Sequence, residues 1–328
     1  MVTGEKISVR TPLIYSQPLS DIAGRDVYLK LENTQPSGSF KLRGLSHLCK
    51  EKYAEGCTKL IGSSGGNAGL ALAYAANKLG VPCQIFVPTY VVPRMLKKIQ
   101  AYGAEVTIGG IDWQEANDQA MAELKKDPNF AIIPPFDHPS IWEGNSTMIS
   151  EIKEDLKGRR PGCVAVSVGG GGLLMGVLTG LEREGWKDVP VLALETVGAE
   201  CFNLSVKANK LVEITLTSIA KTLGARSVTP QLLEKYKDFN VISEVLPDKD
   251  AVHGCVRFAD DHQMLVEPSC GVTMAAVYSK LLPSVLNKYG YDSSSGPLVL
   301  VICGGSDISQ DILQNFINTF GMPCNDVE

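Results

Sequence analysis

The stretch Cys163-Val-Ala-Val-Ser-Val168 runs directly into four consecutive glycines, Gly169 to Gly172. An apolar, valine-rich run of this length is typical of a strand that is buried on both faces. Glycine allows the chain to turn tightly after the strand, and the apolar residues from Leu173 onward predict a helix. Residues 161–181 carry no charge, but consecutive glycines would destabilise a membrane-spanning helix. We therefore expect a strand, a glycine loop and a helix inside a globular fold.

The same alternation of strand-like and helix-like segments continues along most of the 328 residues. The expected strands are Val27–Leu31, Leu60–Gly62, Cys83–Val87, Glu105–Ile108, Cys163–Val168, Val191–Glu195 and Leu298–Cys303. The expected helices are Lys41–Glu55, Asn67–Leu79, Pro93–Tyr102, Asp112–Lys125, Ile141–Leu156, Leu173–Glu184, Val272–Leu282 and a last one after Asp307. This order predicts an α/β protein of two lobes, each with a mostly parallel sheet flanked by helices.

Glycine-rich segments follow three of the expected strands. They are Ile61-Gly-Ser-Ser-Gly-Gly-Asn67, Ser167-Val-Gly-Gly-Gly-Gly172 and Ile302-Cys-Gly-Gly-Ser306. Loops at the carboxyl ends of parallel strands meet at the crevice where ligands bind. Glycine lets the backbone approach a ligand closely, and the next helix offers unpaired N–H groups to an anion. One such loop could be a simple tight turn, but three indicate a ligand crevice.

Composition and missing motifs exclude several classes of function. The charges of 31 Lys and Arg against 36 Asp and Glu give a net charge of −5, so we expect no nucleic-acid or membrane partner. The nine cysteines form no C-x-x-C pair, and there are only four histidines, so no zinc site is predicted. The dinucleotide fingerprint, the P-loop and H-E-x-x-H are all absent. The first residues lack a signal peptide, which predicts a cytoplasmic protein with free thiols.

One alternative from another enzyme class stays open. Gly62-Ser-Ser-Gly-Gly66 matches the G-x-S-x-G nucleophile elbow, with Ser64 as the nucleophile of a hydrolase. Asp137, Asp261, His253 or His262 could supply the acid and the base. The early position of Ser64 leaves little room for the strands that normally precede such an elbow, and a glycine-rich turn is the simpler interpretation.

The segment Pro36-Ser-Gly-Ser-Phe-Lys-Leu-Arg-Gly44 is the most informative. Its first residues favour a turn, and a helix is expected to begin near Phe40. Lys41 then lies at a helix N-terminus, where the helix dipole disfavours a positive charge. A partly desolvated lysine in such a place has a lowered pKa, which suits an imine-forming amine. The tetraglycine could then hold the phosphate of a pyridoxal cofactor.

This segment resembles the cofactor-lysine motif of the serine and threonine dehydratases, members of the pyridoxal-phosphate enzymes of fold type II that include the tryptophan synthase β chain. Ser63-Ser-Gly-Gly-Asn-Ala-Gly69 resembles their substrate-carboxylate loop, and the tetraglycine resembles their phosphate loop. Cys303-Gly-Gly305 resembles the segment that meets the pyridine nitrogen. Pro134-Pro-Phe-Asp and Ile141-Trp-Glu-Gly are similar to the animal L-serine dehydratase and L-threonine deaminase type in particular.

The resemblance implies a role for each matching residue. Lys41 would be the Schiff-base lysine and would move the Cα proton, and Phe40 would lie against the pyridine ring. Asn67 would hydrogen-bond the phenolic oxygen of the cofactor, although it could instead cap a helix. Cys303 would face the ring nitrogen. The phosphate would be bound by the backbone N–H groups of Gly169, Gly170, Gly171 and Gly172.

The substrate implied by the resemblance is a small amino acid. Ser64, Gly65 and Asn67 would hold its carboxylate through a hydroxyl, an amide and a helix N-terminus. The implied reaction is β-elimination, which converts L-serine to pyruvate and ammonia and L-threonine to 2-oxobutanoate and ammonia. A thiol such as Cys303 is a weak donor and leaves the pyridine a weak electron sink, which suits elimination better than transamination.

Two other outcomes remain within the resemblance. Serine racemases carry a serine where this chain has Gly65, so racemisation is expected to be minor here. A non-catalytic relative could keep the loops and bind an amino acid without efficient turnover.

The resemblance also implies features of the whole molecule. A small domain of residues 35–138 would be inserted into a large domain formed by residues 1–34 and 139–328, with the cofactor in the cleft between them. A homodimer is expected. A monovalent cation, potassium in the relatives, would be bound near the phosphate loop by Gly169, Glu195, Ala199, Leu223 and Ala225.

Overall fold

The computed structural model describes residues 6–291 and 295–322. Its strands are β1 (Leu13–Tyr15), β2 (Val27–Lys30), β3 (Lys59–Gly62), β4 (Cys83–Val87), β5 (Glu105–Ile108), β6 (Phe130–Ile132), β7 (Cys163–Ser167), β8 (Val191–Thr196), β9 (Val241–Leu246) and β10 (Leu298–Val301). Its α-helices are α1 (Gln17–Ala23), α2 (Lys41–Ala54), α3 (Asn67–Leu79), α4 (Pro93–Ala101), α5 (Trp113–Leu124), α6 (Pro139–Asp155), α7 (Gly172–Arg183), α8 (Cys201–Ala208), α9 (Leu232–Lys235), α10 (Asp248–His262), α11 (Pro268–Tyr278), α12 (Leu281–Lys288) and α13 (Gln310–Phe320).

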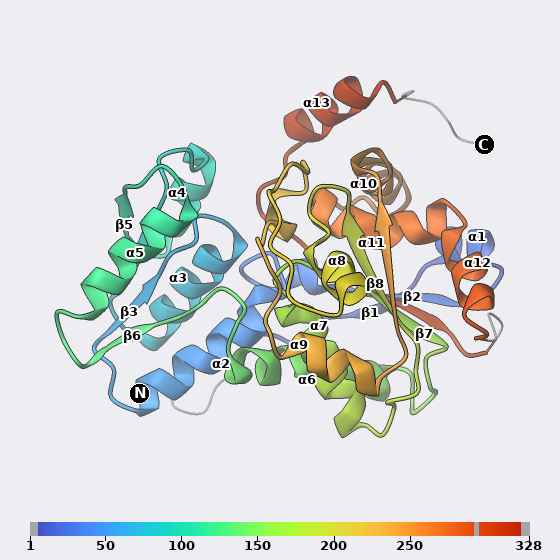
Figure 1. Cartoon of the computed structure of the whole chain (residues 1–328), viewed down its shortest axis with the longest axis horizontal. Helices are drawn as coiled ribbons and strands as arrows, with labels where there is room; N and C mark the ends of the chain where they lie inside the picture. Colours follow the sequence, from blue (N-terminus) through green and yellow to red (C-terminus); the bar gives the residue numbers. More distant parts are fainter. Residues whose placement is uncertain (1–5, 292–294, 323–328) are drawn as a thin grey trace.

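The strands form two sheets, as the alternating pattern predicts. One sheet has the order β5-β4-β3-β6 and is parallel throughout. The other has the order β1-β2-β10-β7-β8-β9 and is parallel except for the pair β1 and β2. Figure 1 shows the smaller sheet with α3, α4 and α5 on one side of the molecule and the larger sheet with α6 to α12 on the other. The α/β architecture with two mostly parallel sheets is confirmed, and the proposed domain boundaries stay a prediction.

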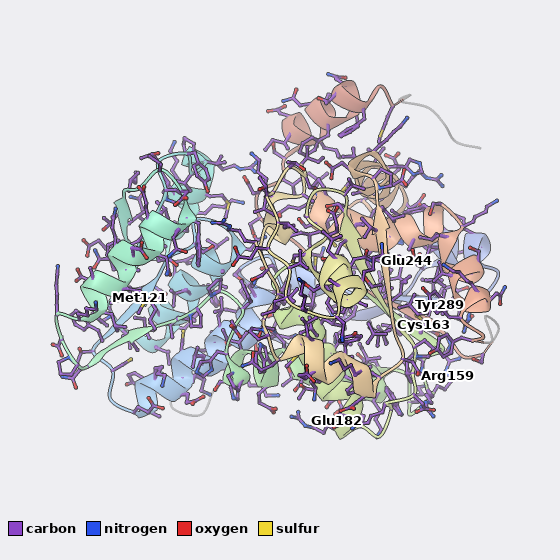
Figure 2. The ribbon with its side chains drawn as sticks, viewed as in Figure 1. Met121, Arg159, Cys163, Glu182, Glu244 and Tyr289 are labelled. Atoms are coloured by element: carbon purple, nitrogen blue, oxygen red, sulfur yellow. The ribbon has the colours of Figure 1, made fainter. Side chains whose placement is uncertain are left out.

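The central strands of both sheets are buried, which explains their continuous apolar sequences. Every residue of β4, β7 and β10 is buried. Figure 2 shows Cys163 inside the body of the protein and Met121 at its outer side; their exposed fractions are 1% and 38%. The eight described cysteines are free thiols, and Cys324 lies outside the described residues.

The charge-free segment 161–181 folds as β7, the glycine loop and the start of α7. No single helix in the described ranges is long and apolar enough to cross a membrane. Only α11 and α12 together meet that test of length and composition, and they bend by 73° where they join. All 11 residues of α11 are buried inside the protein.

The prediction of one helix over Val272–Leu282 was wrong at its carboxyl end. Helix α11 begins earlier, at Pro268, and ends at Tyr278. Lys280 then adopts a left-handed conformation with φ of 57°, and α12 starts at Leu281. A left-handed residue interrupts the helical hydrogen bonds, and apolar periodicity across it does not reveal the break.

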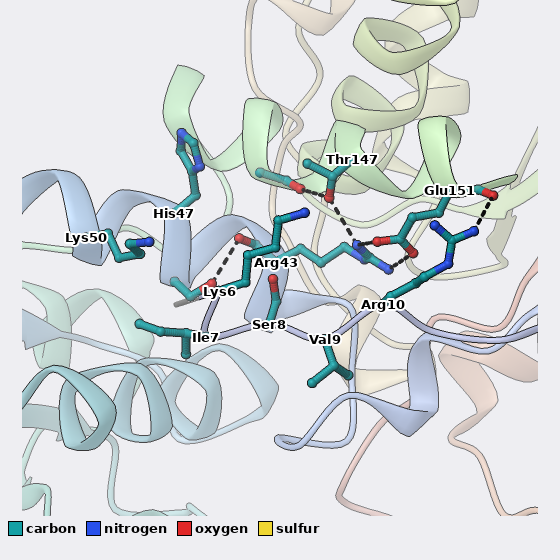
Figure 3. Close-up of a pocket in the computed structure, with 12 residues that line it drawn as sticks. Lys6, Ile7, Ser8, Val9, Arg10, Arg43, His47, Lys50, Thr147 and Glu151 are labelled. Carbon is teal, nitrogen blue, oxygen red and sulfur yellow. Dashed lines mark hydrogen bonds and ion pairs between the residues drawn. The ribbon is translucent and has the colours of Figure 1, made fainter. Parts of the chain in front are cut away.

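Helix α2 packs against both α3 and α6 and so lies between the two sheets (Figure 1). A buried cluster of charges holds it there. Arg43 of α2 pairs with Glu32 at 2.7 Å and with Glu151 of α6 at 2.6 Å. Lys30 of β2 also pairs with Glu151 at 2.6 Å. Figure 3 shows Arg43 reaching across to Thr147 and Glu151.

The members of this charge cluster, Lys30, Glu32, Arg43 and Glu151, are nearly excluded from solvent, with side-chain exposures of 0%, 0%, 2% and 12%. Burial alone would raise the pKa of Glu151, but the hydrogen bonds and charges of Arg43 and Lys30 hold it below its ordinary value. Each charge is therefore acceptable only because its partners are present.

We predict that Glu151→Gln lowers the free energy of unfolding by about 3–5 kcal/mol, because two buried cations lose their shared partner. The decrease in the free energy of unfolding should be largest near neutral pH. The carboxylate has a depressed pKa in the folded state, so its stabilisation is present above the ordinary carboxyl pKa and disappears as the pH falls through the folded value. Chemical denaturation at several pH values would measure both effects.

Glu154→Gln is the matched control, since Glu154 lies on the same helix, is 65% exposed and pairs only with Arg10. Its effect should be small at every pH. Equal losses in the two variants would contradict the assignment of the buried cluster.

Candidate active site

The lysine segment and the third glycine segment pair directly. Ser39 and Gly304 form an antiparallel β-bridge, and the N–H of Phe40 donates to the carbonyl of Cys303 at 3.1 Å. The N–H of Gly305 also donates to the carbonyl of Gly38 at 2.9 Å. The first turn of α2 is therefore fastened to the chain that leaves β10.

Lys41 is the first residue of α2, as predicted. Its amine contacts one backbone carbonyl and lies near two aromatic rings. Its Nζ donates to the carbonyl of Pro135 at 2.7 Å. It lies 5.3 Å from the centroid of the Phe40 ring and 5.8 Å from that of Phe136. Burial lowers the pKa of Lys41 to about 8, against the opposing influence of the nearby Cys303 thiol. Among the residues that the structure describes, no carboxylate pairs with this amine, so a neutral, nucleophilic amine is accessible.

Asn67 has a fixed orientation and does not cap a helix. The cap of α3 is Gly66, and Asn67 is the first helical residue. Its Oδ1 accepts from the N–H of Ser306 at 2.9 Å, and its Nδ2 donates to Glu267 at 3.1 Å. A backbone N–H can only donate, so the oxygen must face Ser306. One hydrogen of the Asn67 amide nitrogen then remains for a further acceptor.

Glu267 is a site residue that the sequence analysis missed. Its side chain is buried, and burial raises its pKa although Thr222, the Asp307 N–H and Asn67 all donate to it. It precedes α11 in a segment without glycine or lysine, so no local pattern marks it. Glu267 contacts Asn67 only because α3 lies close to this segment in the folded chain.

The tetraglycine loop is closely packed against the segment that contacts Lys41. A Cβ atom on Gly170 would lie 2.5 Å from the ring of Phe136, and one on Gly172 would lie 2.8 Å from its carbonyl oxygen. Gly171 has a φ of 91°, which side chains rarely allow. Only glycine therefore fits, and the loop presents its backbone at the N-terminus of α7.

Cys303 lies between the glycine loop and the lysine. It is 6% exposed, and its Sγ lies 3.5 Å from the Oγ of Ser167, the last residue of β7. The structure therefore brings together Phe40, Lys41, Cys303 and the tetraglycine loop, and it ties Asn67 to the same region through Ser306.

Ser64 and Gly65 lie in the loop that leads to Asn67. The Oγ of Ser64 accepts from the N–H of Gly66 at 3.3 Å. A Cβ on Gly65 would lie 2.4 Å from a methyl group of Val91. Val91 thus fills the space that a side chain at position 65 would need.

The hydrolase alternative loses its support. His262 lies 2.9 Å from Ser16, Asp261 accepts from Tyr278, and Asp137 accepts from Thr229. His253 lies against the ring of Tyr278. None of these contacts forms a relay to Ser64.

Three of the residues expected to bind the cation, Gly169, Leu223 and Ala225, lie close together. A Cβ on Gly169 would lie 2.9 Å from the carbonyl oxygen of Leu223, and the N–H of Ala225 donates to that carbonyl. Ala199 is buried at the turn after β8. Burial raises the pKa of Glu195 to about 8, and both its oxygens accept N–H groups at the start of α8. A bound cation would favour the charged form of Glu195, but the cation stays a prediction.

Within the described ranges, no group of three or more His, Cys, Asp and Glu residues is placed to hold a metal ion.

The comparisons with known proteins identify the family of this chain. The family model described as "Pyridoxal-phosphate dependent enzyme" matches residues 6–304, so the chain belongs to the pyridoxal-phosphate dependent enzyme family. It is 44% identical to human "L-serine dehydratase/L-threonine deaminase" over 323 residues, covering 98% of each chain. It is 46% identical to human "Serine dehydratase-like" over 311 residues, covering 94% of each.

The solved structure of a fungal L-serine ammonia-lyase from Rhizomucor miehei has a TM-score of 0.90 and 34% identity, covering 96% of this chain and 100% of that one. Maize serine racemase, at 21% identity and a TM-score of 0.85, shares the fold.

The residues present fit pyridoxal phosphate. An amine with a lowered pKa, a glycine loop at a helix N-terminus and an oriented amide with one spare N–H match its aldehyde, phosphate and phenolic oxygen. These matches concern the donor chemistry of the site, and the role of each residue is treated below as a proposal.

We predict that the protein stripped of cofactor captures pyridoxal phosphate faster as the pH rises, with the rate levelling off above the Lys41 pKa of about 8. The neutral amine is the nucleophile, so its fraction sets the rate. Stopped-flow absorbance over a pH series would measure this profile. A rate still rising towards about pH 10, as for an ordinary lysine, would contradict the prediction; Lys41→Arg should show no capture.

Proposed function

We propose that this protein is a pyridoxal-phosphate dependent ammonia-lyase. It removes water from L-serine, and hydrolysis of the product gives pyruvate and ammonia. L-Threonine gives 2-oxobutanoate and ammonia in the same way. The similarity to serine dehydratases across nearly the whole chain, with Lys41 at the start of α2, carries this proposal.

Pyridoxal phosphate, when bound, supplies an electron sink that stabilises negative charge at the Cα atom of the amino acid. Lys41 links the cofactor to the protein and, when released, takes the Cα proton with its neutral amine. The lowered pKa of Lys41 keeps that amine available near neutral pH.

The loops supply binding and orientation. The backbone N–H groups of Gly169 to Gly172 hold the phosphate at the N-terminus of α7. Asn67 would donate its remaining N–H to the phenolic oxygen, and Phe40 would pack against the pyridine ring. Cys303 would lie by the ring nitrogen as a weak donor. It does not supply the proton that a carboxylic acid would, which favours elimination.

The substrate carboxylate is held at the loop between β3 and α3. Ser64 and Gly65 lie in the turn directly before α3, where the Oγ of Ser64 accepts from the N–H of Gly66 and Asn67 begins the helix. An amino-acid carboxylate suits these donors because several N–H groups there have no helical partner.

A homodimer, a cytoplasmic location and a monovalent cation near Glu195 belong to the same proposal. Size-exclusion chromatography and the activity in potassium compared with tetramethylammonium salts would test the first and the last.

We predict that Lys41→Ala reduces pyruvate formation from L-serine by at least about 10²–10⁴-fold, because the base for the Cα proton is lost. Lys52→Ala is the control, since Lys52 lies on the same helix but pairs with Glu55 at the surface. A coupled pyruvate assay measures the rates. A Lys41→Ala protein with normal turnover would refute the proposal.

Racemisation should be slow. Gly65 has no side chain to donate a proton on the face opposite Lys41, and Val91 fills the adjacent space with methyl groups. We predict D-serine formation at least about 100-fold slower than pyruvate formation, measured by chiral chromatography. Comparable rates would show that another donor reaches this face.

A further inference from the structure

The segment after Cys303 is the meeting point of contacts from both sheets. Ser306 and Asp307 follow β10 of the larger sheet. Asn67 of α3 and two cations of α4, Arg94 and Lys98, reach them from the side of the smaller sheet. We call Arg94, Lys98, Ser306 and Asp307 the α4 clamp.

The contacts of the α4 clamp are close. The Nζ of Lys98 donates to the carbonyl of Ser306 at 2.6 Å, and the Arg94 guanidinium donates to the Asp307 carboxylate at 2.7 Å. On the other side of the same segment, the N–H of Ser306 donates to Asn67 at 2.9 Å and the N–H of Asp307 donates to Glu267 at 2.8 Å. The dipeptide of Ser306 and Asp307 therefore links α4 to Asn67 and to Glu267, which itself accepts from the Asn67 amide.

Burial makes these contacts more than a surface ion pair. The side chains of Arg94 and Asp307 are only 31% and 27% exposed. The Nε of Arg94 is buried and has no hydrogen-bond partner among the described residues. Burial and the neighbouring Arg94 lower the pKa of Lys98, against the attraction of Asp307 and Glu267. A half-buried pair with a desolvated arginine is more costly to break than an exposed one.

Two further contacts restrict the movement of residues 305 and 306 relative to the rest of the site. A Cβ on Gly305 would lie within 2.4 Å of the Glu267 side chain, so the backbone passes directly over that carboxylate. The Oγ of Ser306 also donates to the carbonyl of Ser37 at 3.0 Å, four residues before Lys41. A shift of Ser306 would therefore be transmitted to Asn67 and to the turn that precedes Lys41.

We propose that Arg94 and Lys98 are positioning residues for the reaction: acting through Ser306 and Asp307, they fix the Asn67 amide towards the cofactor. The proposal rests on the function proposed above. Neither cation touches the substrate or the cofactor in this role. Their effect is to fix the position of the Ser306 N–H, which donates to the Oδ1 of Asn67 and without which the Asn67 amide can rotate.

The first test uses the protein without cofactor. In Arg94→Gln and in Lys98→Met, amide hydrogen exchange of the peptide containing Ser306 should become at least about tenfold faster, because the segment opens locally. Arg159→Gln is the matched control, since Arg159 makes a 3.5 Å pair with Asp26 that is about half exposed. It should leave the exchange of this peptide unchanged.

The second test uses the protein loaded with pyridoxal phosphate. In both variants kcat for L-serine should fall by about 10- to 100-fold, as misplacement of a site group by a fraction of an ångström does. KM should change less than kcat, and the visible absorbance band of the cofactor should shift because the donor to the phenolic oxygen is displaced. Exchanging the charges, in Arg94→Asp with Asp307→Arg, should recover part of kcat if the pair itself matters.

Unchanged exchange and an unshifted band in both variants would overturn the proposal. A fall of kcat that only follows a lower melting temperature, with the band unshifted, would also overturn it, because this is the result of a structural role alone. Absence of pyruvate formation by the unmodified protein would refute the proposed function instead, while exchange and the absorbance band would still test the α4 clamp.

Discussion

The short antiparallel bridge between Ser39 and Gly304 is the constraint on which the site depends. It joins the turn before α2 to the chain that leaves β10, two segments that are far apart in sequence. Because the carbonyl of Cys303 accepts the N–H of Phe40, the ring, the amine and the thiol at this point share one rigid backbone frame. The tetraglycine loop reaches the same frame through Phe136, whose ring leaves no room for a side chain on Gly170.

The two parallel sheets explain why four short segments can meet there. The loop at the carboxyl end of β3 meets the one after β10 where Asn67 accepts from Ser306, and the loop after β7 packs against Phe136. Glycine permits the close approach seen at Gly170 and Gly172. In the proposed function, backbone N–H groups of these loops would bind phosphate and carboxylate, and the few reactive side chains would serve proton transfer and orientation.

Patterns along the chain predicted the bounds of several elements correctly, both buried and partly exposed. Strands β4 and β5 and helix α3 agree with the expected bounds, and Lys41 begins a helix as its turn residues indicate. Helix α10 and strand β9 were not expected; β9 is only partly buried, and α10 begins with the acidic residues Asp248 and Asp250. Glu267 and the α4 clamp could not be found in this way, because their importance lies in contacts between distant segments. The segment that contains Phe136 was noted, but its contact with the tetraglycine loop was not predictable from the sequence. Val91 is likewise visible only when a side chain is built on Gly65.

The buried charge cluster of Lys30, Glu32, Arg43 and Glu151 contains two cations and two carboxylates, and Arg43 is only two residues from Lys41. The pKa of Lys41 is lowered by burial, against the opposing influence of the Cys303 thiol. The two cations and two carboxylates of the cluster balance in formal charge, and together they anchor the helix that carries Lys41. An uncharged residue at any one of these four positions would leave a buried charge uncompensated beside the helix that carries Lys41.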